Sequence, residues 1–113
     1  MPIYKIVPRS LWQDAQQQGV FTGAPVDLAD GYIHFSTAHQ LRETAAKHFA
    51  GQTDLLLLVI DDQALGPALI YEPSRGGDLF PHLYAPLALS AVSAIHELPW
   101  HADGHHQFPE GLI

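Results

Sequence analysis

Residues Leu55 to Ile60 form an unbroken apolar run bounded by Asp54 and Asp61. A strand that is apolar on both faces needs cover on both sides, so the run predicts a central strand of a sheet rather than an edge strand. The run is far too short to cross a bilayer, and residues 1–9 lack the apolar core of a secretion signal. We therefore expect a soluble, cytoplasmic protein that folds around this strand.

Composition favours a single domain and excludes several kinds of site and partner. The 113 residues match the usual size of one domain, and 47% of them are apolar, which favours a folded core. Because there is no cysteine, disulfides, thiolate nucleophiles and cysteine-bound zinc are excluded. The formal charge is −7 with only five basic residues, so a nucleic acid partner is disfavoured. A small phosphorylated nucleoside or dinucleotide stays compatible with this charge.

The remaining pattern predicts an α+β domain with two main helices. Strands are expected over residues 3–7, 32–36, 55–60, 68–72 and 92–98. Two positions where Ser or Thr is followed three residues later by Gln have the spacing of capping boxes, and they predict helices over residues 11–18 and 38–50. Residues 22–25 have the composition of a loop. Residues 99–113 predict a tail that is laid on the surface or frayed.

The first candidate site is the segment Gly31 to Thr37. If it is extended, side chains alternate along it, so Tyr32, His34 and Ser36 share one face. The helix that follows would present free backbone N–H groups over Thr37 to Gln40 and the positive end of its dipole, which suits an anion such as phosphate. The alternative is a solvated sheet face beside a helix start that binds nothing.

The second candidate site is the segment Ser74 to Tyr84. Its Gly76-Gly77 pair follows Arg75, whose planar guanidinium suits phosphate or carboxylate. If the segment is extended, the side chains that fall on one side are those of Phe80, His82 and Tyr84. The alternative is a surface loop whose arginine pairs with a nearby acid and whose aromatic residues pad the core.

The eight histidines raise the question of a metal site. The HExxH motif is absent, and a close group of ligand types occurs only near the C-terminus, at His101, Asp103, His105 and His106. These residues could capture Ni²⁺ or Cu²⁺ opportunistically, but we interpret them as part of a solvated tail and expect no metal cofactor. The motifs of serine hydrolases, P-loop enzymes and dinucleotide-binding folds are also absent.

Three segments closely resemble the pattern of the DUF952 family, which is uncharacterised: residues 30–37 (DGYIHFST), 44–49 (TAAKHF) and 80–87 (FPHLYAPL). The family is similar in fold to the ADP-ribosyltransferase superfamily. The resemblance therefore implies a compact α+β domain with a split mixed or antiparallel sheet and a cleft for a nicotinamide dinucleotide. In that superfamily the cleft is lined by a His or Arg on the first strand, a polar or aromatic residue on the next and an acid on a later strand.

The resemblance assigns candidate roles to positions of this chain. The strand from His34 to Ser36 is similar to the second of these strands, and Lys5 occupies the first strand, where His or Arg is expected. The acidic role could fall to Glu72, to Glu97 or to neither. The RNA 2′-phosphotransferase branch has a similar strand but relies on several arginines, which this chain lacks, so a small ligand is favoured over RNA.

The leading hypothesis is an ADP-ribosyltransferase-like enzyme or ligand-binding domain that accepts NAD or a related phosphorylated nucleoside and catalyses glycosidic or phosphoryl transfer. The proposed catalytic residues are His34, Ser36, Glu72 and His82. The proposed ligand-binding residues are Lys5, Thr37, Gln40, Arg75 and Tyr84. One alternative is a non-catalytic module that binds a small ligand or a protein partner, and a weaker one is histidine-based metal binding.

Overall fold

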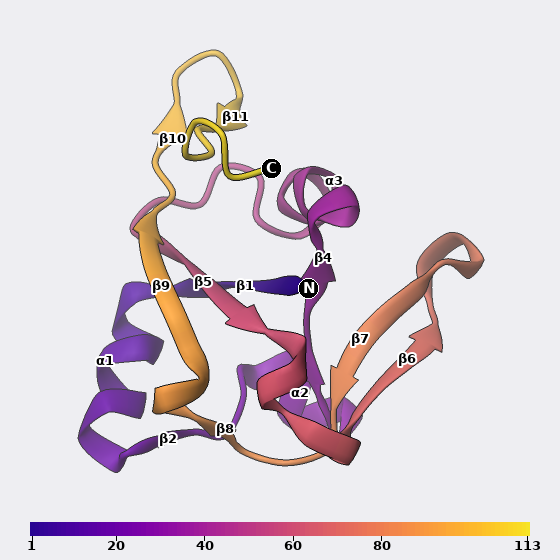
Figure 1. Cartoon of the computed structure of the whole chain (residues 1–113). Coiled ribbons are helices and arrows are strands. Elements are labelled where there is room, and N and C mark those ends of the chain that lie inside the picture. Colours follow the sequence, from indigo (N-terminus) through magenta and orange to yellow (C-terminus); the bar gives the residue numbers. More distant parts are fainter.

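The largest sheet has four strands in the order β4-β1-β5-β9, and each neighbouring pair is antiparallel. Its strands are β1 (Pro2–Pro8), β4 (Ser36–Thr37), β5 (Leu55–Asp61) and β9 (Val92–Glu97). They are seen in a computed structural model that describes residues 1–113, with the exception of the side chain of Arg75. Strand β5 lies between β1 and β9, which confirms the prediction that the apolar run forms a central strand (Figure 1).

Side chains alternate along β5, so they point to both faces of this sheet, and both faces are covered. On one face Leu56, Leu58 and Ile60 share an apolar cluster with residues of helix α1 (Arg9–Gln18). On the other face Leu55, Leu57 and Val59 share a cluster with residues of helix α3 (Ala38–His48). A strand without a polar face therefore lies between two apolar layers, as its sequence requires.

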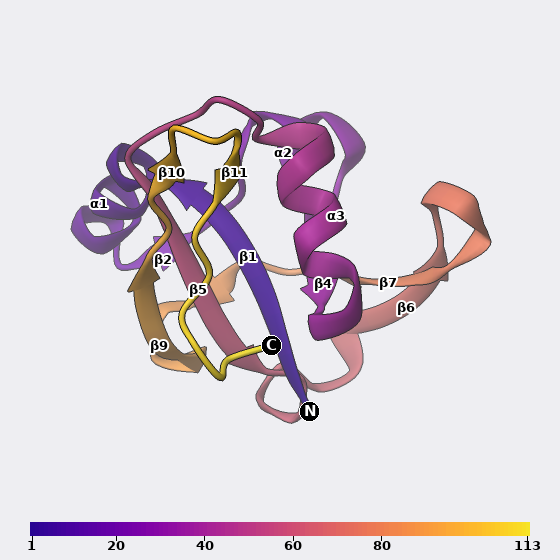
Figure 2. The same cartoon turned by 90° about the horizontal axis from the view of Figure 1, so that it is seen from above.

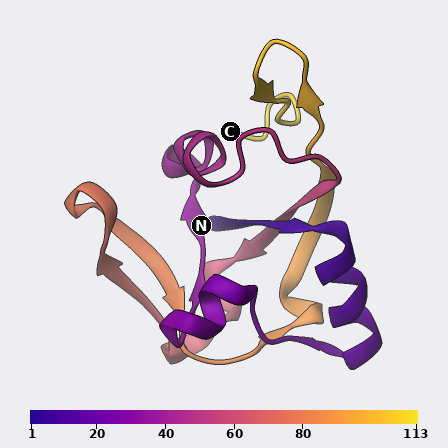
Figure 3. The same ribbon diagram turned by 180° about the vertical axis from the view of Figure 1, so that it is seen from behind.

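A second antiparallel sheet contains β3 (Ile33–His34), β7 (Leu79–Leu83) and β6 (Leu69–Pro73), in that order. Strands β6 and β7 form a hairpin that projects from the body of the molecule on the side away from α1 (Figure 3). Two short pairs complete the strands: β2 (Val20–Phe21) with β8 (Leu87–Ala88), and β10 (Trp100–His101) with β11 (His105–His106). Short 3₁₀ turns span Asp62–Ala64, Gly66–Ala68, Arg75–Gly77 and Leu89–Ala91.

The segment predicted as one strand over residues 32–36 is divided between two sheets at Phe35. His34 pairs with His82 on β7, whereas Ser36 pairs with Tyr4 on β1. Between them, the Phe35 N–H donates to the carbonyl oxygen of Pro81 at 3.0 Å. The prediction that His34 and Ser36 stand in one row assumed a continuous strand, and it is wrong because the chain changes its pairing partner between them.

The helices partly follow the predicted boundaries. Helix α1 begins two residues earlier than expected, and Pro8 at its N-cap replaces the predicted Ser10 cap. Helix α3 begins directly after Thr37 with the predicted capping box, and it ends at His48. A further helix, α2 (Pro25–Asp30), was not predicted. It begins at Pro25, the last residue of the expected loop, since proline is well tolerated in the first turn of a helix. No helix among the described residues is long and apolar enough to span a membrane.

Residues 99–113 are folded back onto the domain rather than frayed. After the β10–β11 hairpin the chain returns across the sheet, where Phe108 is buried in the cluster beneath α3 (Figure 2). The Arg42 guanidinium of α3 lies 4.8 Å from the centre of the Phe108 ring. The glycine, proline and histidine content of this segment suggested a tail, but its few apolar residues are enough to anchor it.

Candidate functional site

The imidazole of His34 lies between two carboxylates from α2. Its Nδ1 is 2.6 Å from Asp27 Oδ1, and its Nε2 is 3.0 Å from Asp30 Oδ2. The His34 backbone N–H also donates to Asp27 Oδ1 at 3.0 Å, which fixes the residue against the helix. A neutral imidazole carries one N–H, so it donates to one of these carboxylates, whereas the protonated ring donates to both. Since the His34 side chain is 29% exposed, a ligand in solution can reach it.

Asp27 is the buried centre of this arrangement, with a side chain that is 1% exposed. Besides His34, it accepts hydrogen bonds from the Ala24 N–H at 2.7 Å and from Lys5 Nζ at 3.3 Å. Burial alone would raise the pKa of Asp27, but the His34 hydrogen bond, the Lys5 charge and the backbone N–H groups together lower it below its ordinary value. Asp27 is therefore the charged acceptor that orients His34.

Lys5 supports the same carboxylate from the main sheet. Its ammonium lies 3.1 Å from Asp27 Oδ2 and donates to the carbonyl oxygen of His34 at 2.8 Å. Burial lowers the pKa of Lys5, and the charge of Asp27 opposes that shift. Because the side chain is 7% exposed and faces Asp27, Lys5 stabilises the site from below and is not free to meet a ligand.

A second imidazole is held by the β6–β7 hairpin. His82 is buried, and its Nδ1 is 2.8 Å from Glu72 Oε1. The Tyr84 hydroxyl donates to the same Glu72 oxygen at 2.6 Å. This bond, followed by the contact with His82, lowers the pKa of Glu72. The bond to Glu72 likewise raises the pKa of Tyr84 to about 12, so the phenol stays protonated as a donor.

Tyr32 brings the two imidazoles together. Its ring centre lies 4.6 Å from that of His34, 4.1 Å from that of His82 and 5.2 Å from that of Tyr84. His34 and His82 are direct cross-strand partners, so their side chains share one face of the small sheet, with ring centres 5.5 Å apart. We call the connected group the His34–His82 cluster; its members are Asp27, Asp30, Tyr32, His34, Glu72, His82 and Tyr84.

A cleft of about 280 Å³ adjoins the cluster. The cluster residues that line it are Asp27, Tyr32 and Tyr84, and neither His34 nor Ser36 is among the described residues along its wall. The volume is just below the range for ligand sites, which begins at about 300 Å³, so it suits one ring system rather than a whole dinucleotide. Any larger ligand would extend from the cleft onto the exposed edge of His34.

The family model described as a protein of unknown function, DUF952, matches residues 6–95. The chain belongs to the DUF952 family. It is similar to the crystal structure of protein CC0527 from Caulobacter crescentus, with 50% identity over 95% of this chain and 94% of that one and a TM-score of 0.91. For the solution NMR structure of CC0527 the identity is 51%, the coverage is 94% and 91%, and the TM-score is 0.84. No curated protein matches the chain.

The CC0527 structures share the fold of this chain, but nothing in their names refers to ADP-ribosyltransferases, so that likeness stays a prediction. The α+β class is observed directly in the elements of this chain. Of the residues predicted to form the site, the structure brings His34, Glu72, His82 and Tyr84 together in the cluster, with Lys5 beneath it.

Three other predicted residues are engaged at the start of α3 in this DUF952 chain. Ser36 is buried, with its hydroxyl 2.8 Å from that of Thr44. The Thr37 N–H donates to Gln40 Oε1 at 3.0 Å, and Gln40 Nε2 donates to the carbonyl oxygen of Leu79 at 2.8 Å. These contacts hold α3 on the sheets, so they do not extend the His34–His82 cluster.

Two candidates remain, Arg75 and Glu97. The Arg75 side chain falls outside the described part of the structure. Glu97 is on β9, at the edge of the main sheet opposite β4, where it forms an ion pair with Arg9. Of the two acids considered from the resemblance, Glu72 is therefore the one that contacts an imidazole of the DUF952 site.

Sequence reasoning did not select Asp27 or Asp30, because residues 22–25 were expected to form a loop and no helix was predicted after them. One signal was present: Pro25 followed by an acid two residues later is typical of the first turn of a helix. Gly23 also belongs to this arrangement, since a Cβ atom there would lie 2.8 Å from the Cβ of Asp27. The close approach of backbone and buried carboxylate could not be read from the sequence.

Proposed function

We propose that this DUF952 protein binds a nucleoside-type ligand, with NAD or a related phosphorylated nucleoside as the candidate class, and transfers a glycosidic or phosphoryl group. The observation that carries the proposal is the pair of imidazoles, each oriented by a carboxylate and both packed on Tyr32 beside an open cleft. The ADP-ribosyltransferase-like character rests on the family resemblance and is part of this proposal.

Proton transfer is best assigned to His34. A buried carboxylate on Nδ1 favours the tautomer in which Nδ1 carries the proton, so that Nε2 is the basic atom. Its contact there, Asp30, is 47% exposed and can rotate away when a ligand approaches. His82 is buried beneath Tyr32, so it supports the site through Glu72 and does not meet the ligand directly.

Charge indicates which part of the ligand enters the cluster. Three carboxylates (Asp27, Asp30 and Glu72) and one ammonium (Lys5) give −3 + 1 = −2 when both imidazoles are neutral, and 0 when both are protonated. This balance disfavours a phosphate deep in the site. The uncharged base and ribose therefore suit the cleft, where Tyr32 and Tyr84 offer ring faces, and the phosphate would stay at the rim.

Binding can be tested by melting the protein with and without millimolar NAD, ADP-ribose, adenosine and a 2′-phosphonucleotide. A ligand at 100 times its Kd stabilises the folded state by about 2.7 kcal/mol, which is a measurable rise in Tm. His34→Gln should lose the rise, and the exposed His39 on α3 provides a matched control, His39→Gln, that should keep it. If none of the four compounds raises the Tm, the proposal fails.

Turnover is measured separately, by chromatography of NAD and the 2′-phosphonucleotide after incubation with the protein. Release of nicotinamide or phosphate that disappears in His34→Gln, while that variant keeps its melting temperature, supports catalysis. Binding without any product would instead favour the non-catalytic ligand-binding module.

A further inference from the structure

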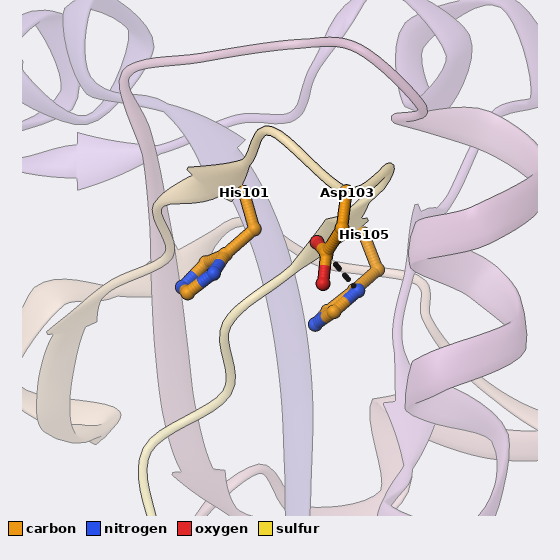
Figure 4. Close-up of side chains that lie close together, drawn as sticks. All are labelled: His101, Asp103 and His105. Carbon is orange, nitrogen blue, oxygen red and sulfur yellow. Dashed lines mark ion pairs between the residues drawn. The ribbon is translucent and has the colours of Figure 1, made fainter.

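Three side chains of types that commonly bind metal ions lie close together at the tip of the β10–β11 hairpin: His101, Asp103 and His105 (Figure 4). His101 and His105 are cross-strand partners, and their rings are stacked with centres 5.4 Å apart and planes 9° from parallel. Asp103 lies in the loop between the strands, with Oδ1 3.0 Å from His105 Nδ1. One ligand atom from each of the three residues lies within 4.8 Å of the others.

The hairpin is held by contacts that do not use these side chains. The Gly104 N–H donates to the carbonyl oxygen of His101 at 3.0 Å, and Gly104 has a φ of +100°, which is why glycine suits this turn. On the inner face His106 is buried, and its Nε2 lies 3.0 Å from the carbonyl oxygen of Gln52. The Trp100 ring packs edge-on against the His106 ring, with ring centres 4.8 Å apart. The strand alternation therefore turns His101 and His105 outward and excludes His106 from their group.

We infer that His101, Asp103 and His105 form a binding site for a divalent transition-metal ion such as Zn²⁺, Ni²⁺ or Cu²⁺. Two imidazoles and a carboxylate are a donor set that these ions prefer, and the remaining positions would be filled by water. Bonds of about 2.1 Å to a tetrahedral ion place two ligand atoms about 3.4 Å apart, so ligand atoms that lie within 4.8 Å of one another need to approach by at most about 1.4 Å. The two stacked rings also need to turn so that their nitrogen lone pairs converge on the ion. All three are exposed and can rotate by that amount.

The overall charge of the chain supports this assignment. With a formal charge of −7 the protein attracts cations, and Asp103 supplies a negative charge at the site itself. Among the three ions, Cu²⁺ should bind most tightly, because the general order of divalent stabilities peaks at copper. This site is separate from the His34–His82 cluster and does not depend on the proposed function.

The test is isothermal titration of untagged, chelator-treated protein with ZnCl₂, NiCl₂ and CuCl₂. We expect saturable binding of one ion per chain, weakened by more than about 10-fold in a His101→Asn/His105→Asn double variant. The matched control is His39→Asn/His96→Asn, which removes two histidines from α3 and β9 and should bind as the unmodified protein does. Survival of tight binding in the hairpin variant, or its loss in the control, would overturn the inference.

Two further variants distinguish the hairpin site from metal binding elsewhere on the chain. Asp103→Asn keeps both imidazoles, so it should weaken binding by less than the double histidine variant, and an unchanged affinity would contradict the three-ligand set. His48→Gln, at the exposed end of α3, should bind metal normally, since this residue lies outside the hairpin. Circular dichroism spectra of each variant test whether its substitutions leave the fold intact.

Discussion

Replacing Lys5 by Met should destabilise the protein because it leaves a buried carboxylate without its cation. Asp27 is 1% exposed, and Lys5 at 3.1 Å is the ammonium that faces it. Removing one partner of a buried ion pair costs about 3–5 kcal/mol. Asp27 keeps its contacts with the Ala24 N–H and with the N–H and ring of His34, so we expect the lower end, about 3 kcal/mol. At about 4 °C per kcal/mol for a domain of this size, the Tm should fall by roughly 12 °C.

The assay is urea and thermal unfolding followed by circular dichroism, with two comparison variants. Lys47→Met breaks an exposed pair with Glu43 and should change the unfolding free energy by less than about 0.5 kcal/mol. In the Lys5→Met/Asp27→Asn double variant the uncompensated charge is gone, so part of the stability should return, with a coupling free energy of about 1–3 kcal/mol. If Lys5→Met alone is no less stable than Lys47→Met, or if the double variant recovers nothing, the assigned role of the pair is wrong.

Three other predictions concern the same region. The pKa of Asp27 is lowered in the folded state, so its contribution to stability is complete above the ordinary carboxyl pKa and is lost as the pH falls through the folded pKa. The free energy of unfolding in urea should therefore decline between about pH 5 and pH 2, and Asp27→Asn should reduce that decline. Gly23→Ala should cost more than Gly19→Ala, since both glycines have positive φ but only Gly23 approaches Asp27; equal losses in urea unfolding would refute this. Tyr84→Phe should raise the pKa of Glu72 in an NMR titration, and an unchanged value would mean that the Tyr84 hydroxyl does not set it.

The parts of the fold that depend on local pattern were predictable. The apolar run of β5 and the Thr37–Gln40 capping box each carry their own physical signal, and both are found where expected. Helix α2 was missed because its proline resembled a loop signal. The exchange of partners at Phe35 was missed for a different reason: periodicity gives the direction of a side chain but not the strand that pairs with it.

The site was predictable only in part for the same reason. His34, His82, Glu72 and Tyr84 were selected from two separate segments, but only the pairing of β3, β7 and β6 brings them into contact. The resemblance of the chain to DUF952 motifs could not indicate that Lys5 would pair with a buried aspartate. That pairing depends on α2 approaching β1, a long-range contact that no local sequence pattern encodes.

The projecting hairpin gives the two imidazoles unequal support. His34 is tied to the main sheet through Asp27 and Lys5, whereas His82 and Glu72 belong to an arm that extends beyond the body of the molecule (Figure 1). Bending of the hairpin beyond the His34–His82 pair would move Glu72 relative to the two rings while leaving both apolar layers intact. A compound that contacts both His34 and the β6–β7 hairpin would therefore restrain the hairpin. Its binding would be detected as slower hydrogen exchange in β6 and β7.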